Sequence, residues 1–446
     1  MKILNILKTI RNNWKKSTVA ACLVAYGVDY ARERQRVQDM MRVFCRDAVA
    51  LGQQSSSASR RVTVILNPAA NGRKAAKDFE KYCAPLLHLA GLTVSVVHSD
   101  NEGQIKGLLD VMDNTDCVVV AGGDGSLSEA VTGLLRRPDA SSAAQRLPIG
   151  VVPLGATNQV ARSIFGTNYP AREDFIADAT NSILQNNTKK IDVMRIQPKS
   201  ESGEGKPVFA LGEVQWGAYR DAYVRRNRYW LYGPWRSYAS MVFSWPKQEL
   251  GWECKARVKY VKPCAGCSKC GAQHLVAPQQ EPPANRRWWH SFSVKPATTI
   301  EKRADYSKVI NEECGMEHEV EINVVDLSIA TPNATPTFQS SESALQVAIG
   351  PKEVGFTDFV KEGWSRLQGN PPTFNEVFLA RELWFKPEIK DKEATEEKKE
   401  EEVKTETYMR WLSIDHENYE LNPMHITLQP NRLNIFCPTR TSTVPA

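Results

Sequence analysis

A glycine-rich turn at the end of an apolar run constrains this chain more than any other feature. Residues 117–121 are Cys-Val-Val-Val-Ala, residues 122–126 are Gly-Gly-Asp-Gly-Ser, and a helical pattern continues through residue 135. A buried strand, a tight turn and a helix are therefore predicted in succession. Glycines have no Cβ, so backbone N–H groups can approach a phosphate there, and the helix N-terminus adds positive potential. The turn predicts a phosphate site.

The turn differs from two common nucleotide motifs. No Gly-Lys-Ser/Thr closes it as in a Walker A loop, and Ser128 stands where the dinucleotide-binding fingerprint needs its third glycine. Asp124 lies inside the turn, where a carboxylate beside a phosphate is repelled unless it binds a metal or takes up a proton. Asp124 is therefore a candidate metal ligand or general base.

Apolar runs alternate with helical patterns from residue 61 to residue 152. Strands are predicted at 62–66, 93–97, 117–121 and 149–152, and helices at 74–89, 104–112 and 126–135. This alternation is typical of a parallel sheet covered by helices. The first and fourth strands end in Asn67-Pro68 and in residues 153–158, Pro-Leu-Gly-Ala-Thr-Asn. Ligands of open α/β sheets bind at this edge, so the three loops predict a nucleotide phosphate site.

Composition excludes several classes of protein. The 446 residues allow two or three domains. The formal net charge of +6 is too small for the dense basic stripe of a nucleic-acid-binding protein, so we expect no nucleic-acid partner. No apolar run reaches about 18 residues, which excludes a polytopic membrane protein. Ten scattered cysteines do not indicate a disulfide-rich secreted scaffold.

Residues 1–54 predict a targeting and membrane-anchor helical segment. Residues 1–16 carry five basic and no acidic side chains, with apolar residues at helical spacing, as in a mitochondrial targeting or membrane-surface helix. Residues 18–28 are apolar but have only about half the length of a usual transmembrane helix. Trp14 and Tyr30 flank this run and favour a single membrane anchor. A signal peptide and a solvated helix packed on its own domain are the alternatives.

A change of pattern near residue 190 predicts a second domain. Residues 55–60 are small and polar and indicate a linker, so we expect the α/β domain at 60–190. Strands and turns dominate residues 191–440, beginning with strands at 191–197 and 208–215, and predict a mainly β, sandwich-like domain. Two insertions are expected within it, near 262–291 and 386–407, the second a charged run.

Residues 264–270, Cys-Ala-Gly-Cys-Ser-Lys-Cys, lie in the first insertion with the spacing of metal ligands. Cys254, His274 and His290 are near enough in sequence to complete a tetrahedral zinc set. A loop with free thiols or disulfides fits the same residues. The sequence therefore leaves zinc and disulfides open.

Four motifs together resemble the diacylglycerol and sphingosine kinase superfamily. They are Asn67-Pro68, residues 122–126 with Glu129, residues 153–158, and Asp415-His416-Glu417, the last where that superfamily has Asp-Gly-Glu. Residues 11–16, 84–89, 213–221 and 433–437 are similar to the acylglycerol kinases of animal mitochondria. The resemblance covers most of the chain and is weak only across residues 262–312 and the charged run.

The resemblance implies a diacylglycerol-kinase-type catalytic fold and a lipid-substrate role for the second domain. It implies ATP-dependent, Mg²⁺-assisted phosphorylation of monoacylglycerol and diacylglycerol to lysophosphatidic and phosphatidic acid. Asp124 and Glu417 are the implied catalytic residues, Asp124 and Asp415 the implied metal ligands, and Asp221 the implied substrate-binding residue. The implied ATP-binding residues are Asn67, Pro68, Gly122, Gly123, Gly125, Ser126, Glu129, Gly155, Ala156, Thr157 and Asn158. Tyr223 stands where sphingosine kinases have a carboxylate for the sphingoid base, which favours a neutral glycerolipid.

The resemblance also implies a location and a second role. It implies the mitochondrial inner membrane, with the folded domains facing the intermembrane space, and a non-catalytic role as a subunit of the carrier translocase in protein import. A purely structural import subunit is one alternative to the kinase. A soluble-metabolite kinase of the nicotinamide-dinucleotide or phosphofructokinase type, which shares the Gly-Gly-Asp-Gly turn, is the other. The Asn-Pro loop, the Asp-x-Glu motif and the anchor count against that enzyme.

Overall fold

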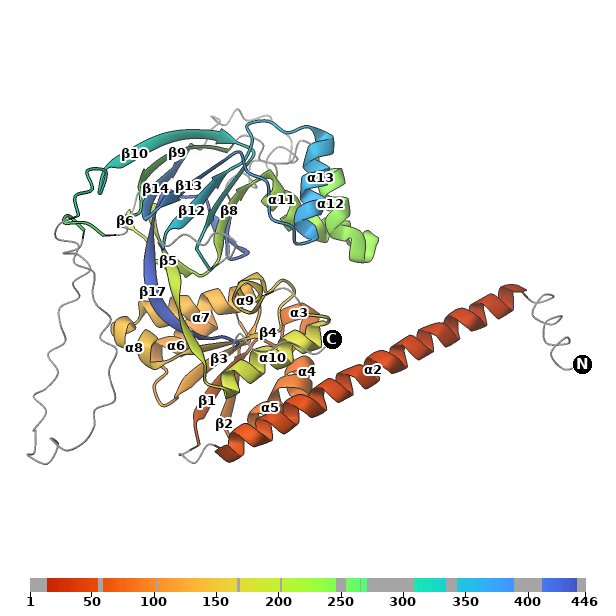
Figure 1. The fold of residues 1–446 in the computed structure, drawn as a ribbon. Coiled ribbons are helices and arrows are strands. Elements are labelled where there is room, and N and C mark those ends of the chain that lie inside the picture. The colour runs from red at the N-terminus through yellow and green to blue at the C-terminus, as the bar shows by residue number, and fades with distance from the viewer. Residues whose placement is uncertain are drawn as a thin grey trace, which may run out of the picture. The chain divides into compact units, whose positions relative to one another are not determined.

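The computed structural model describes residues 14–54, 59–101, 103–166, 169–200, 203–245, 254–264, 266–270, 309–333, 343–388 and 411–438. The chain divides into two compact units, one of Met1–Val193 with Asn431–Ala446 and the other of Met194–Pro430. Strands β5 (Thr188–Ser200) and β17 (Met424–Phe436) each run from one unit into the other (Figure 1).

A parallel sheet forms the centre of the first unit, as the alternating pattern predicts. Its strands are β1 (Arg61–Leu66), β2 (Thr93–His98), β3 (Cys117–Gly122) and β4 (Ile149–Pro153). They lie in the order β2-β1-β3-β4, and Ile435 near the end of β17 pairs in parallel with Ile149 of β4. Every residue of β3 is buried, which fits a central strand with helices on both faces.

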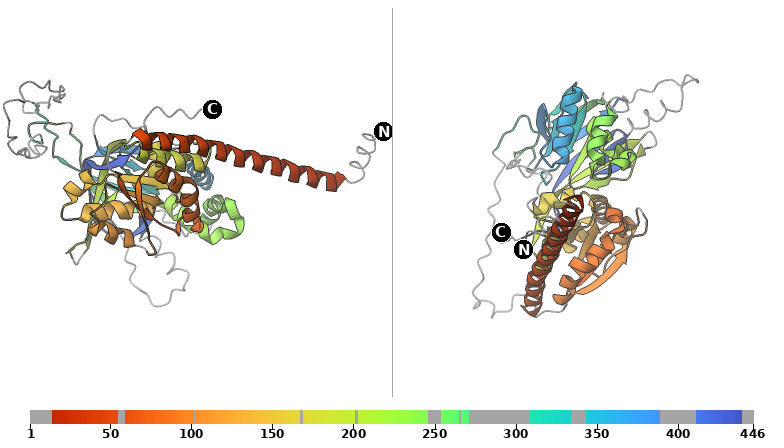
Figure 2. Two further views of the ribbon diagram at one scale, coloured as in Figure 1. Left: turned by 90° about the horizontal axis from the view of Figure 1, so that it is seen from below. Right: turned by 90° about the vertical axis from the view of Figure 1, so that its right-hand side faces the viewer.

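Helices cover both faces of this sheet (Figures 1 and 2). They are α2 (Trp14–Gln54), α3 (Ala70–Arg73), α4 (Ala75–Asp78), the π-helix η1 (Phe79–Cys83), α5 (Ala84–Leu89), α6 (Gln104–Val111), α7 (Asp124–Arg136), α8 (Ala140–Arg146), α9 (Gln159–Phe165) and α10 (Arg172–Leu184). Phe79, Leu87 and Ile176 pack against Val64 and Val119 in the core on one face. Helix α7 packs against β3 and α6.

The helix predicted at 74–89 is present but interrupted. A π-helical turn, η1, separates α4 from α5, and Pro85 lies in the first turn of α5. Proline has no N–H group to donate to the carbonyl four residues earlier, so a uniform α-helix cannot run through residue 85. Phe79, Tyr82 and Cys83 of the π-helical turn remain buried.

Two antiparallel sheets form the second unit, which confirms the predicted mainly β sandwich. The strands β10-β9-β14-β17 are the antiparallel part of an 11-stranded sheet that also contains β5, β6, β7 and the parallel strands β1 to β4. The other sheet has the order β13-β12-β11-β8-β15-β16. The strands are β6 (Gly203–Glu204), β7 (Val208–Ala210), β8 (Glu213–Gly217), β9 (Cys254–Val261), β10 (Glu317–Val324), β11 (Asp326–Ala330), β12 (Leu345–Ile349), β13 (Glu376–Ala380), β14 (Glu382–Pro387), β15 (Trp411–Ile414) and β16 (Glu417–Glu420). Trp216 and Phe385, one from each sheet, meet edge to face in the shared core with ring centroids 5.3 Å apart.

The second unit also contains helices that the strand-rich pattern does not predict. They are α11 (Ala218–Val224), the 3₁₀ segment η2 (Arg225–Trp235), α12 (Arg236–Ser244) and α13 (Phe356–Leu367). Tyr219 of α11, Met241 of α12 and Phe359 of α13 pack in one apolar cluster. These helices therefore form a small layer of their own.

The single strand predicted at 208–215 is wrong, because the chain bends at Leu211 and Gly212 and separates β7 from β8. The backbone N–H groups of Leu211, Gly212 and Glu213 all donate to the carboxylate of Asp415. The N–H groups of Leu211 and Gly212 are directed at this side chain and cannot also join a strand ladder, whereas Glu213 begins β8 and pairs with Ala330. The break thus depends on a residue about two hundred positions away in sequence.

Helix α2 contains the apolar run predicted as an anchor. Its side chains Val19, Leu23, Val24 and Tyr26 are all at least 60% exposed. Across the part of the chain that the structure describes, no helix is both long and apolar enough to cross a membrane. The basic segment before Trp14 and most of both predicted insertions lie outside the described residues.

Candidate active site

Three loops follow β1, β3 and β4 at the carboxyl edge of the first sheet, as predicted. Because these strands are neighbours, backbone hydrogen bonds connect the loops directly. The N–H of Asn67 donates to the carbonyl of Ala121 at 3.0 Å, and the N–H groups of Leu154 and Gly155 both donate to the carbonyl of Gly122 at 2.9 Å. The three predicted nucleotide motifs of this unit therefore form one connected structure.

Glycines permit a very close approach between the second and third loops. A Cβ on Gly155 would lie 2.3 Å from the Cα of Gly123, and a Cβ on Gly122 would lie 2.7 Å from the Oγ of Ser126. Real Cβ atoms do not come this close to other heavy atoms. Gly123 is the N-cap of α7, so the N–H groups of Gly125 and Ser126 lie in the first helical turn. This arrangement fits an anion bound at a helix N-terminus.

Asp124 is buried and binds the start of α9. Its Oδ2 accepts hydrogen bonds from the hydroxyl of Thr157 at 2.8 Å and the N–H of Gln159 at 2.9 Å, and its Oδ1 accepts one from the N–H of Val160 at 3.0 Å. Only 4% of Asp124 is exposed. A carboxylate has about four acceptor positions, so one remains for another donor or a metal. The sequence did not indicate this helix-capping contact.

Asn67 and Asn158 fix the shape of the other two loops. Asn67 Nδ2 donates to Ser126 Oγ at 2.9 Å, and Asn67 Oδ1 accepts from the N–H of Ala69 at 3.1 Å. Asn158 has a left-handed backbone with φ 53°, which asparagine tolerates better than most residues. Its side chain bridges Gly155 and the carbonyl of Pro153. These two predicted ATP-binding residues thus hold loop backbone in place.

The remaining predicted ATP-binding residues vary in exposure. Ala156 is exposed, Pro68 and Thr157 are half-buried, and Glu129 is 8% exposed on α7. Glu129 Oε1 accepts a hydrogen bond from the N–H of Gly103 at 3.0 Å, which fixes the start of α6. Its Oε2 is buried and has no hydrogen-bond partner among the described residues.

Arg172 is a positioning residue that the sequence reasoning missed. Its guanidinium donates to the carbonyls of Leu154 and Gly155 at 2.8 and 2.9 Å and lies 3.6 Å from a carboxylate oxygen of Asp78. It therefore holds the third loop from the side of α10. A lone arginine gives no signal of this contact in sequence.

In the second unit, Asp415 and His416 form the two-residue turn of the β15–β16 hairpin. Both have positive φ angles, 46° and 67°, as a type I′ turn requires. The turn therefore forms although His416 replaces the glycine of the resembled motif. The Asp415 carboxylate is 2% exposed and accepts three backbone N–H bonds of 2.8–3.0 Å from residues 211–213.

Arg220 connects Asp221 with Asn418, the residue that follows Glu417 in β16. Arg220 Nη1 donates to Asp221 at 2.8 Å, and Arg220 Nη2 donates to Asn418 Oδ1 at 2.5 Å, next to Glu417 in the chain. Asp221 is 3% exposed, whereas Glu417 is half-buried and its Oε2 lies 3.4 Å from the Tyr419 hydroxyl. Arg220 thus connects the predicted substrate residue with the neighbour of the predicted base, whereas the side chain of Glu417 points to the opposite face of β16.

Glu213 is a further carboxyl beside this turn, half-buried at the start of β8. Its Oε1 accepts a hydrogen bond from Gln215 at 2.6 Å and its Oε2 one from Ser328 at 3.1 Å. Burial raises the pKa of Glu213, and the neighbouring His416 opposes that shift. Glu213 was part of the family resemblance but carried no predicted role.

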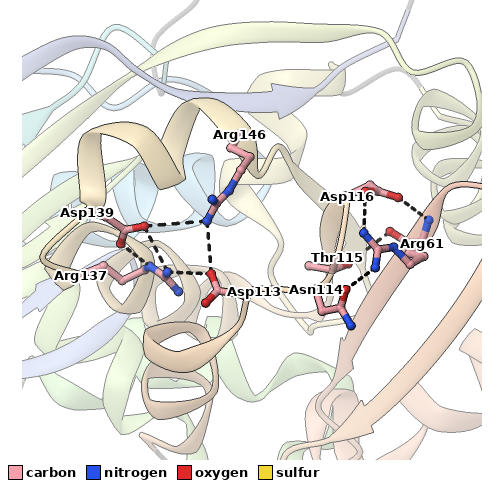
Figure 3. Close-up of a pocket in the computed structure, with 8 residues that line it drawn as sticks. All are labelled: Arg61, Asp113, Asn114, Thr115, Asp116, Arg137, Asp139 and Arg146. Atoms are coloured by element: carbon pink, nitrogen blue, oxygen red, sulfur yellow. Dashed lines mark hydrogen bonds and ion pairs between the residues drawn. The ribbon is translucent and has the colours of Figure 1, made fainter.

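A cleft of about 660 Å³ lies at the opposite, amino-terminal edge of the first sheet (Figure 3). It is lined by Arg61, Asp113, Asn114, Thr115, Asp116, Arg137, Asp139 and Arg146. Arg137 binds Asp139 at 2.8 Å and Asp113 at 3.1 Å, and Arg61 and Arg146 also have acidic partners. Because its three arginines and three aspartates neutralise each other, this cleft fits a phosphate poorly.

Comparison with known proteins decides the family. The diacylglycerol kinase catalytic domain matches residues 61–196, and the acylglycerol kinase C-terminal domain matches residues 211–444. The mitochondrial acylglycerol kinase of Xenopus laevis is 34% identical over 98% of this chain and 96% of that protein. The human mitochondrial acylglycerol kinase is 33% identical over 97% of this chain and 96% of that protein. The chain belongs to the acylglycerol kinase family.

Membership of the acylglycerol kinase family confirms the predicted enzyme class, an ATP-dependent lipid kinase. It also confirms the predicted diacylglycerol-kinase-type catalytic fold in the first part of the chain. The solved structure of a diacylglycerol kinase from Bacillus anthracis aligns with 86% of this chain over 98% of its own chain. The sequence identity is 15% and the TM-score is 0.46.

Proposed function

We propose that this acylglycerol kinase family member transfers the γ-phosphoryl group of ATP to the free hydroxyl of monoacylglycerol and diacylglycerol. The products are lysophosphatidic acid and phosphatidic acid. The observation that carries this proposal is the set of three interlocked loops at one sheet edge, in a chain similar to named acylglycerol kinases over almost its whole length.

Phosphoryl transfer needs positioning and neutralisation of charge more than covalent chemistry. In this proposal the first turn of α7 and the glycines of the second and third loops hold the phosphates of ATP. Asn67, Asn158 and Arg172 keep that backbone in shape before ATP binds. Mg²⁺, when bound, neutralises phosphate charge and prefers oxygen ligands.

The carboxylates divide into buried and accessible groups. Asp124 keeps one acceptor position, which fits its predicted role as a metal ligand or general base. Asp415 accepts three backbone N–H groups, so a metal bound by it would compete with those donors. Glu417 is half-buried and is the better placed of the motif's two carboxylates to take a proton from an acceptor hydroxyl.

The lipid acceptor is assigned to the second unit. Asp221 is buried against Arg220 and so serves best as a positioning group that aligns Arg220 with Asn418. Tyr223 offers no carboxylate to an ammonium group, which supports a neutral glycerolipid over sphingosine.

The proposed location is the mitochondrial inner membrane, with the folded units facing the intermembrane space. Its support is that the named relatives are mitochondrial and that α2 exposes apolar side chains. We further propose a role as a subunit of the carrier translocase, on the family resemblance alone. Co-purification of translocase subunits with an Asp124→Asn chain tests a role that is independent of phosphorylation.

An assay of the purified full chain with labelled ATP, Mg²⁺ and a panel of acceptors tests the kinase proposal. The panel contains monoacylglycerol, diacylglycerol, sphingosine, nicotinamide dinucleotide and fructose 6-phosphate. We expect label in the two acylglycerols. Label only in a soluble acceptor would overturn the proposal.

Asp124→Asn and Glu417→Gln should each lower turnover by the roughly 10²–10⁴-fold typical of acid–base groups. The matched control is Asp39→Asn, which removes a carboxylate from an exposed ion pair with Arg42 and should leave turnover unchanged. Loss in only one of the two variants assigns the base to that residue. Normal turnover in both variants would contradict the proposed site.

A further inference from the structure

Four cysteines from two distant segments meet at the end of the β9–β10 hairpin. Cys264, Cys267 and Cys270 follow β9, and Cys314 precedes β10. Their Sγ atoms all lie within 4.8 Å of one another. The Cys267–Cys270 sulfur distance is 3.6 Å and the Cys264–Cys270 distance is 3.7 Å. Cys267 and Cys270 are buried, and the other two are half-buried.

We propose that these four cysteines bind one structural Zn²⁺ ion. A tetrahedral zinc site with zinc–sulfur bonds of ~2.3 Å has sulfur–sulfur edges of about 3.8 Å, close to the 3.6 and 3.7 Å that separate Cys270 from Cys267 and Cys264. A disulfide needs its two sulfurs at about 2.05 Å, so these four are spaced for a shared metal and not for pairwise bonds. All four are free thiols in the structure.

Polar groups around the sulfurs fit this assignment. The backbone N–H of Cys267 donates to Cys270 Sγ at 3.3 Å, and Asn311 Nδ2 donates to Cys264 Sγ at 3.3 Å. Such donors stabilise negative charge on thiolate ligands and orient them, as outer-shell groups of metal sites do. Gly266, with φ 135°, lies between the first two cysteines, where most other side chains would strain the backbone.

The position of the cluster indicates what the ion would do. Val261 of β9 pairs with Glu317 of β10, so the cysteines lie just beyond the last paired residues of the hairpin. The N–H of Ser268 also donates to the carbonyl of Val309 at 2.8 Å, so the segment after β9 is bonded to the segment before β10. Four protein ligands leave no open coordination position, so the site is structural and not catalytic. It would close the base of the long connection between the strands.

The set differs from the one that the sequence indicated. Cys254 begins β9 and is buried in the sandwich core, where it packs with apolar residues and not with this cluster. His274 and His290 lie outside the described residues. Cys314 completes the tetrahedron, and only the pairing of β9 with β10 brings it there.

Metal analysis of the purified full chain, without an affinity tag that binds metals, tests the proposal. We expect about one zinc per chain by elemental mass spectrometry. Cys264→Ser and Cys314→Ser should each lower that content several-fold. The control is Cys22→Ser, which removes an exposed thiol from α2 and should retain the full zinc content.

A second measurement covers the case in which the serine variants fail to fold. Cobalt added to the metal-free wild-type chain should give the intense visible bands and thiolate charge-transfer bands of a tetrahedral sulfur site. Zinc should then displace the cobalt. A chain without zinc whose intact mass shows cysteines joined as disulfides would overturn the proposal. So would a chain that contains iron in place of zinc, or a cobalt spectrum without thiolate bands.

Discussion

Gly155 is the residue at which the backbones of two nucleotide loops approach each other most closely. A Cβ there would lie 2.3 Å from the Cα of Gly123, a backbone atom, and 2.7 Å from Oδ1 of Asn158, whose side chain is held by three hydrogen bonds. The N–H groups of Leu154 and Gly155 in the third loop also both donate to the carbonyl of Gly122, where the second loop begins. A substitution at Gly155 must therefore displace one loop from the other.

We predict that Gly155→Ala lowers kcat/KM by about 10²-fold, because a loop displacement of the order of 1 Å misplaces the phosphates. The control is Gly107→Ala in α6, where a Cβ meets nothing within 4 Å. That change should stabilise the helix by about 1 kcal/mol and leave activity unchanged. Steady-state kinetics of the two variants checks this, and normal kinetics in Gly155→Ala would show that the contact is not needed.

A second prediction about a single residue concerns the pKa of Glu213, a carboxyl of the second unit. Its pKa is raised by burial above the ordinary value of 4.5. Burial disfavours the charged form of this carboxyl in the folded protein, whereas well below pH 4.5 the carboxyl is protonated in both the folded and the unfolded state. The contribution of Glu213 to stability thus falls as the pH rises from the ordinary pKa through the raised one.

We predict that Glu213→Gln raises the thermal unfolding midpoint at pH 7 and has little effect at pH 4. The glutamine keeps an oxygen for Ser328 without the buried charge. Glu420→Gln, an exposed change on β16, should leave the midpoint unchanged at both pH values. A lower midpoint for Glu213→Gln at pH 7 would mean that the charge of Glu213 stabilises the unit.

At the scale of elements, one arginine holds α13 on the sheet of β11. Arg366 Nη1 binds Asp326 at 2.7 Å, its Nε binds Glu362 at 2.9 Å, and its guanidinium lies 4.0 Å from the centre of the Tyr219 ring. The side chain of Asp326 is only 4% exposed. Burial raises the pKa of Asp326, and Arg366 opposes that shift.

We predict that Arg366→Ala lowers the free energy of unfolding of this unit by about 3–5 kcal/mol, because it leaves a buried carboxylate without its partner. Arg366→Lys should lower the free energy of unfolding by less, since lysine keeps the positive charge but lacks the planar group over Tyr219. The control is Arg257→Ala, which removes an exposed pair and should cost no more than about 1 kcal/mol. Urea unfolding measures all three, and equal losses at Arg366 and Arg257 would contradict the assignment.

For the whole molecule, α2 is the element that bears on membrane attachment. Leu23 and Val24 are each 66% exposed, and Tyr26 is 72% exposed. Further along the same helix, Arg36 binds Asp174 of α10 at 2.8 Å, so one part of α2 is packed and another exposes apolar side chains. Exposed apolar side chains of this kind fit insertion into a lipid surface.

We predict that replacing Leu23 and Val24 by Asp releases the full chain from membranes, at a cost of roughly 2.5–3.5 kcal/mol per charge for an inserted helix. Both side chains are exposed, so the fold should persist. The matched control is Val111→Asp, which changes a side chain of α6 that is 77% exposed. A chain with this substitution should stay bound to membranes. Alkaline carbonate extraction separates the outcomes. If α2 is an inserted anchor, the wild-type chain stays in the membrane pellet. Release of the wild-type chain would mean that α2 is only a peripheral helix.

Local patterns in the sequence determined much of the first unit. The strands β1 to β4 and the glycine turn could be predicted because apolar periodicity and glycine chemistry act within a few residues. The Asp-x-Glu motif could be located in the sequence, but the type I′ turn at Asp415 and His416 is known only from the structure, because His416 stands in place of the motif's glycine. The enzyme class followed from the order of these motifs along the chain.

Only the tertiary structure decided which distant groups bind each other. Asp124 caps α9, Arg172 holds the third loop, Asp415 breaks β7 from β8, and Cys314 joins three cysteines beyond the paired residues of β9 and β10. Each contact joins residues between 17 and more than 200 positions apart and has no periodic signal. A side chain's partners depend on how strands and helices stack, which no local window contains. Sequence therefore identified the chemical groups, and packing decided which of them support the loops and which remain available for chemistry.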